Sequence, residues 1–122
     1  MKKQMKFKGV LELNGYLEDL CEEVKSGQMK GAQASIWKWD ALVANPELAI
    51  HAEWDSFCGL CEDYQGEDYQ GCNGCPIEPC ASGREDWDQM EDAGTPDEWL
   101  KGAKAFKARL KRDIKAHNQR SE

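Results

Sequence analysis

Apolar residues recur at steps of three and four between residues 9 and 44, the spacing at which side chains share one face of an α-helix. The first run stops at Ser26 and Gly27, and the second stops at Asn45 and Pro46, all of them residues typical of helix ends. The apolar positions are Val10, Leu13, Leu17, Leu20, Cys21 and Val24, then Ala32, Ile36, Trp39 and Val43. The pattern predicts an N-terminal helical hairpin over residues 9–44, with helices at about 9–25 and 29–44, and a short helical piece after Pro46.

A long helix is predicted over residues 96–117. Thr95 is a typical N-cap residue, Pro96 suits the first helical position, and Asp97 and Glu98 place carboxylates in the first turn. The apolar stripe then comprises Trp99, Ala103, Phe106, Leu110, Ile114 and His117. We expect this stripe to pack on both helices of the hairpin. A shorter acidic helix, opened by a capping box at Ser82, is predicted through Trp87 and Met90.

Four cysteines between the two helical parts have the spacing of a zinc site. Cys58 and Cys61 form one C-x-x-C pair, and Cys72 and Cys75 form a second. Each pair forms a tight turn that aims two thiolates at one point, about 2.3 Å from a tetrahedral metal. The sequence therefore predicts a mainly α fold, a small helical domain of residues 1–122 stapled by zinc knuckles at residues 58–80.

Other readings of the cysteines remain open. Four thiolates also hold an iron–sulfur cluster, although such clusters usually need more closely spaced cysteines, and a redox dithiol or disulfide is a third alternative. Cys80 could replace Cys75 as a ligand, lie beside the metal, or be a small buried apolar residue. Cys21, on the apolar stripe of the first helix, is expected in the core. The polar and basic segment after Met1 argues against a secreted, disulfide-bonded protein.

A perfect tandem repeat separates the two cysteine pairs. Residues 62–66 and 67–71 both read Glu-Asp-Tyr-Gln-Gly. Two copies are too few for a repeat fold, so we interpret them as a duplicated surface loop. Asp63, Tyr64 and Tyr69 are candidate contact residues for a partner on that loop.

The net charge of −7 is unevenly distributed along the chain. Residues 40–98 carry sixteen carboxylates and a single cation, Arg84, whereas residues 101–122 carry eight cations and two carboxylates. Four thiolates on zinc would add two more negative charges to the middle. No apolar run approaches the length that spans a bilayer, so we expect no membrane contact. The sequence predicts an acidic, metal-bearing face and a basic C-terminal helix.

Several short motifs together resemble a family of small bacteriophage and prophage proteins. They are Ile36-x-Lys38-Trp39, Cys58-x-Leu60-Cys61-x-x-Tyr64, Cys72-x-Gly74-Cys75-Pro76-Ile77 and Gly94-Thr95-Pro96-x-x-Trp99, over roughly half of the chain. The family usually keeps a cysteine near Cys80, often just ahead of Gly-Thr-Pro, whereas here fourteen residues separate Cys80 from Thr95. The resemblance implies a phage origin, a zinc-binding helical domain and a place in the host cytoplasm, but no activity.

Protein binding is the function that these observations favour. Four thiolates leave no coordination position open for water, so hydrolysis at the metal is not expected. An acidic surface can complement a basic site on a host protein, with Asp86 and Asp88 as further candidate contacts and Trp37, Trp54 and Trp87 as candidate aromatic anchors. The alternative is nucleic-acid binding by residues 101–120, whose cations include Lys101, Lys104, Lys107, Arg109, Lys111, Arg112 and Lys115. The oligomeric state is not predicted.

Overall fold

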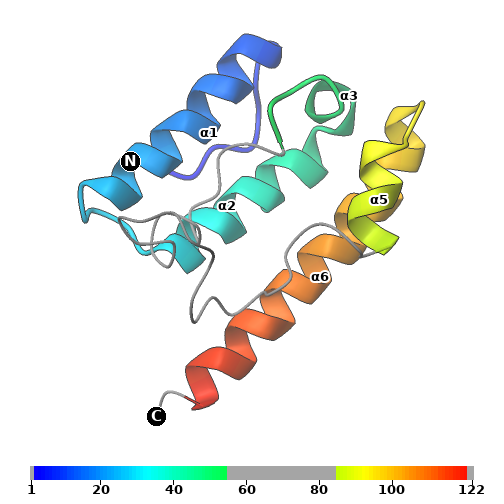
Figure 1. The fold of residues 1–122 in the computed structure, drawn as a ribbon. Helices are drawn as coiled ribbons and strands as arrows, with labels where there is room; N and C mark the ends of the chain where they lie inside the picture. Colours follow the sequence, from blue (N-terminus) through cyan, green and yellow to red (C-terminus); the bar gives the residue numbers. More distant parts are fainter. Residues whose placement is uncertain (1, 55–84, 121–122) are drawn as a thin grey trace, which may run out of the picture.

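The computed structural model describes residues 2–54 and 85–120, with side chains as far as residue 116. Within these residues the chain forms five helices and no strand (Figure 1). The helices are α1 (Val10–Lys25), α2 (Gly31–Ala44), α3 (Pro46–Ala49), α5 (Glu85–Glu91) and α6 (Pro96–Arg120). The predicted mainly α fold, with an N-terminal helical hairpin and a long C-terminal helix, is confirmed. The cysteine knuckles lie outside the described residues.

A tight turn joins α1 to α2 where the sequence predicts it. The amide of Ser26 donates to the carbonyl of Glu22 at 3.0 Å, and that of Gly27 donates to Val24 at 3.1 Å. Gly27 has a φ of 79°, a left-handed conformation that favours glycine because it lacks a Cβ. Lys30 is extended and precedes the first residue of α2, which begins at Gly31, two residues later than predicted.

The start of α6 is capped by side chains. Thr95 Oγ1 accepts a hydrogen bond from the amide of Glu98 at 3.2 Å, and the Glu98 carboxylate accepts one from the amide of Gly94, also at 3.2 Å. The two bonds satisfy amides that the helix itself leaves without an acceptor. The predicted cap at Thr95, with Pro96 as first helical residue, is confirmed.

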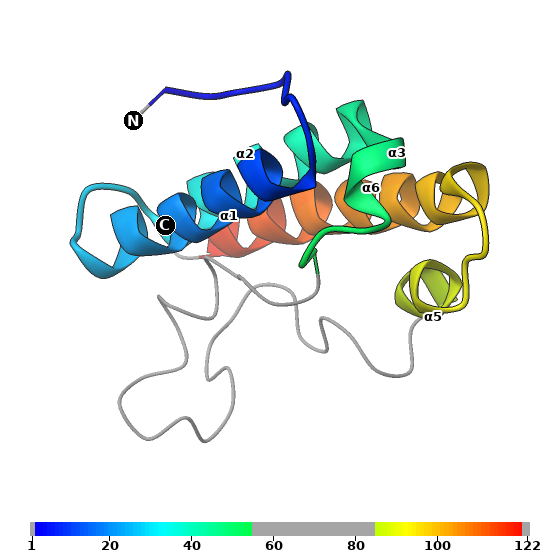
Figure 2. The same ribbon diagram turned by 90° about the horizontal axis from the view of Figure 1, so that it is seen from above.

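The second helix of the hairpin lies at the centre of the fold. In Figure 1, α2 runs between α1 and α6, and Figure 2 shows α5 beside the first half of α6. Among the described helices, α1 packs on α2 and α3, while α6 packs on α2, α3 and α5. The stripe of α6 therefore meets α2, as predicted, but its predicted packing on the first helix is wrong, because α2 stands between the two.

This central position explains why α2 has no single buried face. Ala32, Ile36 and Val43 are only partly buried, whereas Lys38 and Asp40 are buried. A helix covered on two sides must bury residues around most of its circumference. The predicted apolar face of α2 is thus incomplete, with Trp39 its one fully buried member.

One hydrophobic core contains residues from both described parts of the chain, 2–54 and 85–116. Cys21 is buried, as predicted, among the apolar residues of α1. The other buried core side chains include Leu13, Leu17 and Leu20 of α1, Trp39 and Leu42 of α2, Met90 of α5, and Trp99, Phe106, Leu110 and Ile114 of α6. None of the described helices is long and apolar enough to cross a membrane.

Candidate binding surfaces and the base of the cysteine segment

The predicted metal ligands lie outside the described residues. These are Cys58, Cys61, Cys72 and Cys75, with Cys80 as the further candidate; Asp63, Tyr64 and Tyr69 lie in the same segment. Among the residues that the structure does describe, no group of three or more His, Cys, Asp or Glu side chains could hold a metal ion. The structure instead shows what surrounds the two ends of this segment, at Trp54 and at Glu85.

The two ends are held together by an aromatic cluster. Its members are Trp39, Trp54, Trp87, Trp99 and Phe106. The rings of Trp54 and Trp87, one on each side of the cysteine segment, have centroids 5.1 Å apart. Trp39 contacts the other four rings at centroid distances between 4.6 and 6.4 Å, a range in which aromatic pairs attract one another. The described residues on the two sides of positions 55–84 therefore meet in one aromatic cluster.

Two of the predicted aromatic anchors belong to this cluster. Trp54 is buried, and Trp87 is half-buried, with its indole N–H donating to Glu91 Oε1 at 2.8 Å. Their rings pack on Trp39 of α2 and on Phe106 or Trp99 of α6. In the described structure, their main role is therefore to join the cysteine segment to the helical core.

The second end of the segment is fixed by close packing of α5 on α6. A Cβ at Gly102 would lie 2.6 Å from the backbone oxygen of Asp86 and 2.9 Å from Cγ of Met90. Only glycine lets the two helices approach so closely. Gly102 thus sets the position at which the chain returns from residues 55–84.

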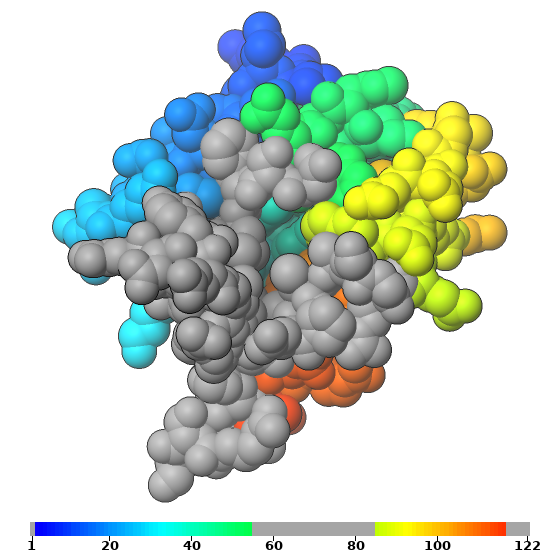
Figure 3. Space-filling view, viewed as in Figure 1, coloured from blue at the N-terminus to red at the C-terminus, as the bar shows by residue number. Residues whose placement is uncertain are grey.

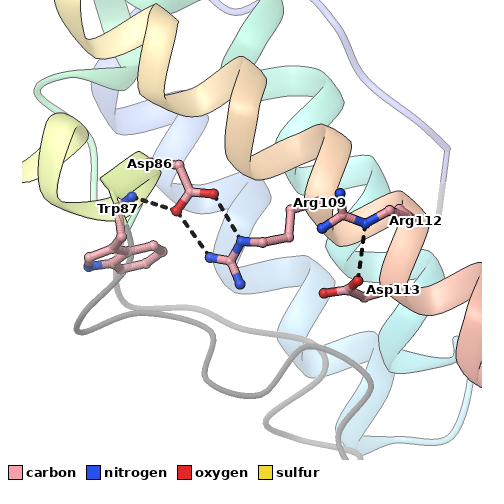
Figure 4. Close-up of polar contacts among 5 residues, drawn as sticks. All are labelled: Asp86, Trp87, Arg109, Arg112 and Asp113. Carbon is pink, nitrogen blue, oxygen red and sulfur yellow. Dashed lines mark hydrogen bonds and ion pairs between the residues drawn. The ribbon is translucent and has the colours of Figure 1, made fainter.

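A buried ion pair also joins α5 to α6 (Figure 4). Arg109 Nε donates to Asp86 Oδ2 at 2.9 Å, and Arg109 Nη2 donates to Asp86 Oδ1 at 3.1 Å. The two parallel hydrogen bonds make this a strong ion pair. The side chains are only 9% and 11% exposed, so the pair is also largely shielded from water. Asp86, predicted as a partner contact, therefore has its carboxylate engaged inside the protein, while Asp88 is exposed.

Exposed carboxylates occur on α3 and α5, which both pack on α6, and on the first turn of α6. We define this acidic end as residues 45–54 and 85–100, which contain no lysine or arginine. Figure 3 shows α5 (yellow) on the face of the molecule that Figure 1 presents, and Figure 2 shows α3 and α5 separated, with α6 between them in that view. The exposed carboxylates are Glu47, Glu53, Glu85, Asp88, Glu91, Asp92, Asp97 and Glu98. Apart from Asp40 and Asp86, the described carboxylates of the predicted acidic face are thus exposed around α3, α5 and the start of α6.

A second buried carboxylate lies on the other side of α6 and was not singled out from the sequence. Asp40 of α2, 9% exposed at its side chain, contacts the ammonium groups of Lys3 at 2.8 Å, Lys107 at 2.8 Å and Lys111 at 3.3 Å. Burial raises the pKa of Asp40, but Lys107, Lys3 and Lys111 together outweigh it and hold this pKa at about 2. Asp40 therefore joins the N-terminal segment, α2 and α6.

The cations of α6 from Lys101 to Lys115 form two groups, according to the side of the helix on which they lie. Lys107 and Arg109 contact Asp40 and Asp86 inside the protein. Five others are exposed on the outer side of the helix, namely Lys101, Lys104, Lys111, Arg112 and Lys115. We call these five, with the exposed Ala105 and Ala108 among them, the outer face of α6. Only part of the basic helix is thus available to a partner.

Comparison with known proteins adds no further assignment. No protein-family model, curated protein or solved structure matches this chain. The site must therefore be argued from its own residues.

Proposed function

We propose that this protein is a structural-zinc protein of phage origin that binds a basic site on a host protein and thereby modulates or inhibits it. The observation that supports this proposal is the acidic end, where eight exposed carboxylates occur with no lysine or arginine among residues 45–54 and 85–100. Such a one-signed surface attracts a basic partner over distance and speeds the encounter.

The part of the acidic end on α5 is attached firmly to α6, which favours its use in recognition. α5, which carries Glu85, Asp88 and Glu91, is fixed to α6 by the Asp86–Arg109 pair and by the close approach at Gly102. A surface that is already ordered loses little conformational entropy when a partner binds. The exposed carboxylates of α5 are therefore presented in a fixed arrangement.

We assign the metal to Cys58, Cys61, Cys72 and Cys75 on the chemistry of the donor set. Four thiolates with this spacing suit a closed tetrahedral zinc, which stabilises structure and offers no open position for catalysis. The contact between Trp54 and Trp87 supports the assignment, because it brings together the two sides of the segment that carries all four cysteines. A zinc ion bound by four thiolates would carry a net charge of about −2 and so add to the acidity of the middle of the chain.

Metal analysis tests this part of the proposal. The purified protein is expected to contain one zinc per chain, and replacing any of these cysteines by serine should remove it. Cys21→Ala is the matched control, since Cys21 is buried on α1 and should leave the zinc content unchanged. Iron with labile sulfide in place of zinc would contradict the assignment.

Affinity capture from a host lysate tests the binding function. The variant Asp88→Lys/Asp92→Lys reverses two exposed charges of the acidic end, and Glu18→Lys/Asp19→Lys makes the same change on the exposed side of α1. We expect the wild type and the α1 variant to retain the same host protein and the acidic-end variant to lose it. Equal retention by both variants would refute the role of the acidic end.

The alternative is that nucleic acid is the main partner and contacts the basic helix. The exposed outer face of α6 favours this candidate. It predicts the opposite outcome in the capture experiment, namely that nuclease treatment removes the captured material and that reversal at Asp88 and Asp92 has no adverse effect.

A further inference from the structure

The exposed cations of the outer face of α6 form a one-sided stripe, in two groups separated by Ala105 and Ala108. At about 100° per residue, Lys101, Lys104, Lys111, Arg112 and Lys115 fall within an arc of roughly 120°. At about 1.5 Å per residue they extend over roughly 21 Å of the helix. No carboxylate lies in this arc between residues 101 and 115, because Asp113, which contacts Arg112 at 3.4 Å, points to another side.

Most of the outer cations take no part in the ion pairs that join the helices, and Lys111, which contacts Asp40, is the exception. Asp40 is neutralised mainly by Lys107 and Lys3, and Asp86 by Arg109. Lys101, Lys104 and Lys115 have no ion pair with any described carboxylate, and Lys111 reaches Asp40 only at 3.3 Å with half of its side chain exposed. The inner and outer cations of α6 therefore have different roles.

The surface relief of the stripe favours a partner that approaches the helix closely. Ala105 and Ala108 are exposed between the cations, and because their side chains are short the middle of the outer face protrudes less than its two ends. Lysine and arginine side chains on either side can then extend to a row of anions lying along the helix. Regularly spaced anions over about this length occur in the phosphate backbone of a nucleic acid.

We infer that the outer face of α6 binds the phosphate backbone of nucleic acid, as a surface separate from the acidic end. Contacts are centred on the second half of α6, because α5, with its carboxylates, packs on the first half at Gly102. Like charges at the acidic end repel a polyanion there and orient it toward residues 104–115. Recognition of phosphate alone makes the binding independent of base sequence and sensitive to salt.

Binding of a fluorescently labelled DNA duplex of about 20 base pairs, followed by anisotropy between about 50 and 200 mM salt, tests the inference. The variant Lys104→Ala/Lys115→Ala removes two outer cations. Lys8→Ala/Lys30→Ala, at exposed positions outside α6, is the matched control. We expect the α6 variant to bind roughly 10- to 100-fold more weakly at low salt and its salt slope to fall by about two, with the control unchanged. Equal circular dichroism and melting temperatures would show that all three proteins are folded.

Three outcomes would overturn the inference. The first is absence of duplex binding at low salt, and the second is equal weakening by the two double variants. The third is displacement of the duplex by poly-glutamate of matched charge as efficiently as by unlabelled duplex, which would mean that the surface recognises an acidic protein. None of these outcomes affects the acidic end, whose test uses Asp88 and Asp92.

Discussion

Replacement of Asp40 by asparagine should destabilise the protein by an amount that depends on pH. The structure holds the pKa of Asp40 at about 2, below its ordinary value of 3.8, through Lys107, Lys3 and Lys111. At about 1.4 kcal/mol for each pH unit, this difference corresponds to about 2 kcal/mol of stability at neutral pH. Asparagine keeps the shape of the side chain and removes its charge, so it isolates the electrostatic contribution.

The direction of the pH dependence follows from the lowered pKa. A carboxyl whose pKa is lower in the folded state stabilises fully above its unfolded pKa and loses this contribution as the pH falls toward its folded pKa. The stability difference between wild type and Asp40→Asn should therefore be about 2 kcal/mol at pH 7 and pH 5, and about 1 kcal/mol at pH 3. Taking the difference between the two proteins cancels the other carboxyl groups.

Urea unfolding at low ionic strength, followed by tryptophan fluorescence, measures both quantities. The aromatic cluster around Trp39 makes this signal sensitive to the core. Asp19→Asn, at an exposed position on α1, is the control and should change stability by less than about 0.5 kcal/mol. A stability difference for Asp40→Asn that stays constant from pH 7 to pH 3, or that is as small as that of the control, would refute the reasoning.

Three further substitutions, the first with a comparison variant at Gly15, test how the helices are held. Gly102→Ala should destabilise the fold by about 1–3 kcal/mol, because the added Cβ meets the backbone of α5. Gly15→Ala has open space around it and should stabilise the fold by about 0.5–1 kcal/mol. Equal effects of the two substitutions in thermal unfolding would contradict the close approach of α5 and α6. Asp86→Ala should cost about 3 kcal/mol in urea unfolding because it leaves Arg109 without its bidentate carboxylate, and a loss below about 1 kcal/mol would show the pair to be unimportant. Thr95→Ala should cost about 1 kcal/mol through loss of the cap on α6, and no measurable change would refute the capping role.

The helices were predictable because their signals are local. Caps such as Thr95 and Pro96 act within one turn, and the three- and four-residue spacing of apolar residues requires only a helix with one buried face. These signals placed α1 and the start of α6 within one residue of their positions in the structure. They also predicted α2, but not which of its residues are buried, because burial from two sides removes the single apolar face that the spacing rule assumes.

The ion pairs were not predictable because they join residues far apart in the chain. Asp40 meets Lys107 and Lys111 only after α6 has packed on α2, and in the sequence it was one acidic residue among many. Asp86 was assigned to the surface for the same reason, since nothing near it in the sequence indicates Arg109. A charged residue within an otherwise apolar helix, such as Lys38 or Asp40 in α2, was the available signal that buried charge had to be considered.

The candidate binding site was predictable in outline only. The sequence indicated an acidic middle and a basic C-terminal helix, and the structure places eight exposed carboxylates around α3, α5 and the start of α6 and separates outer from inner cations on α6. That placement depends on the close approach of α5 to Gly102, which is a tertiary contact. The cysteine spacing, by contrast, is a local pattern, and its metal stays a prediction.

The central claim is that the acidic end binds a basic host protein, and association kinetics test it most directly. The rate constant of association between the captured host protein and each variant would be measured at about 50 and 200 mM salt. Charge reversal at Asp88 and Asp92 should lower the rate at low salt by roughly 10-fold or more and weaken its salt dependence, while reversal at Glu18 and Asp19 should leave both nearly unchanged. Identical rates and identical salt dependence for the two variants would contradict the claim.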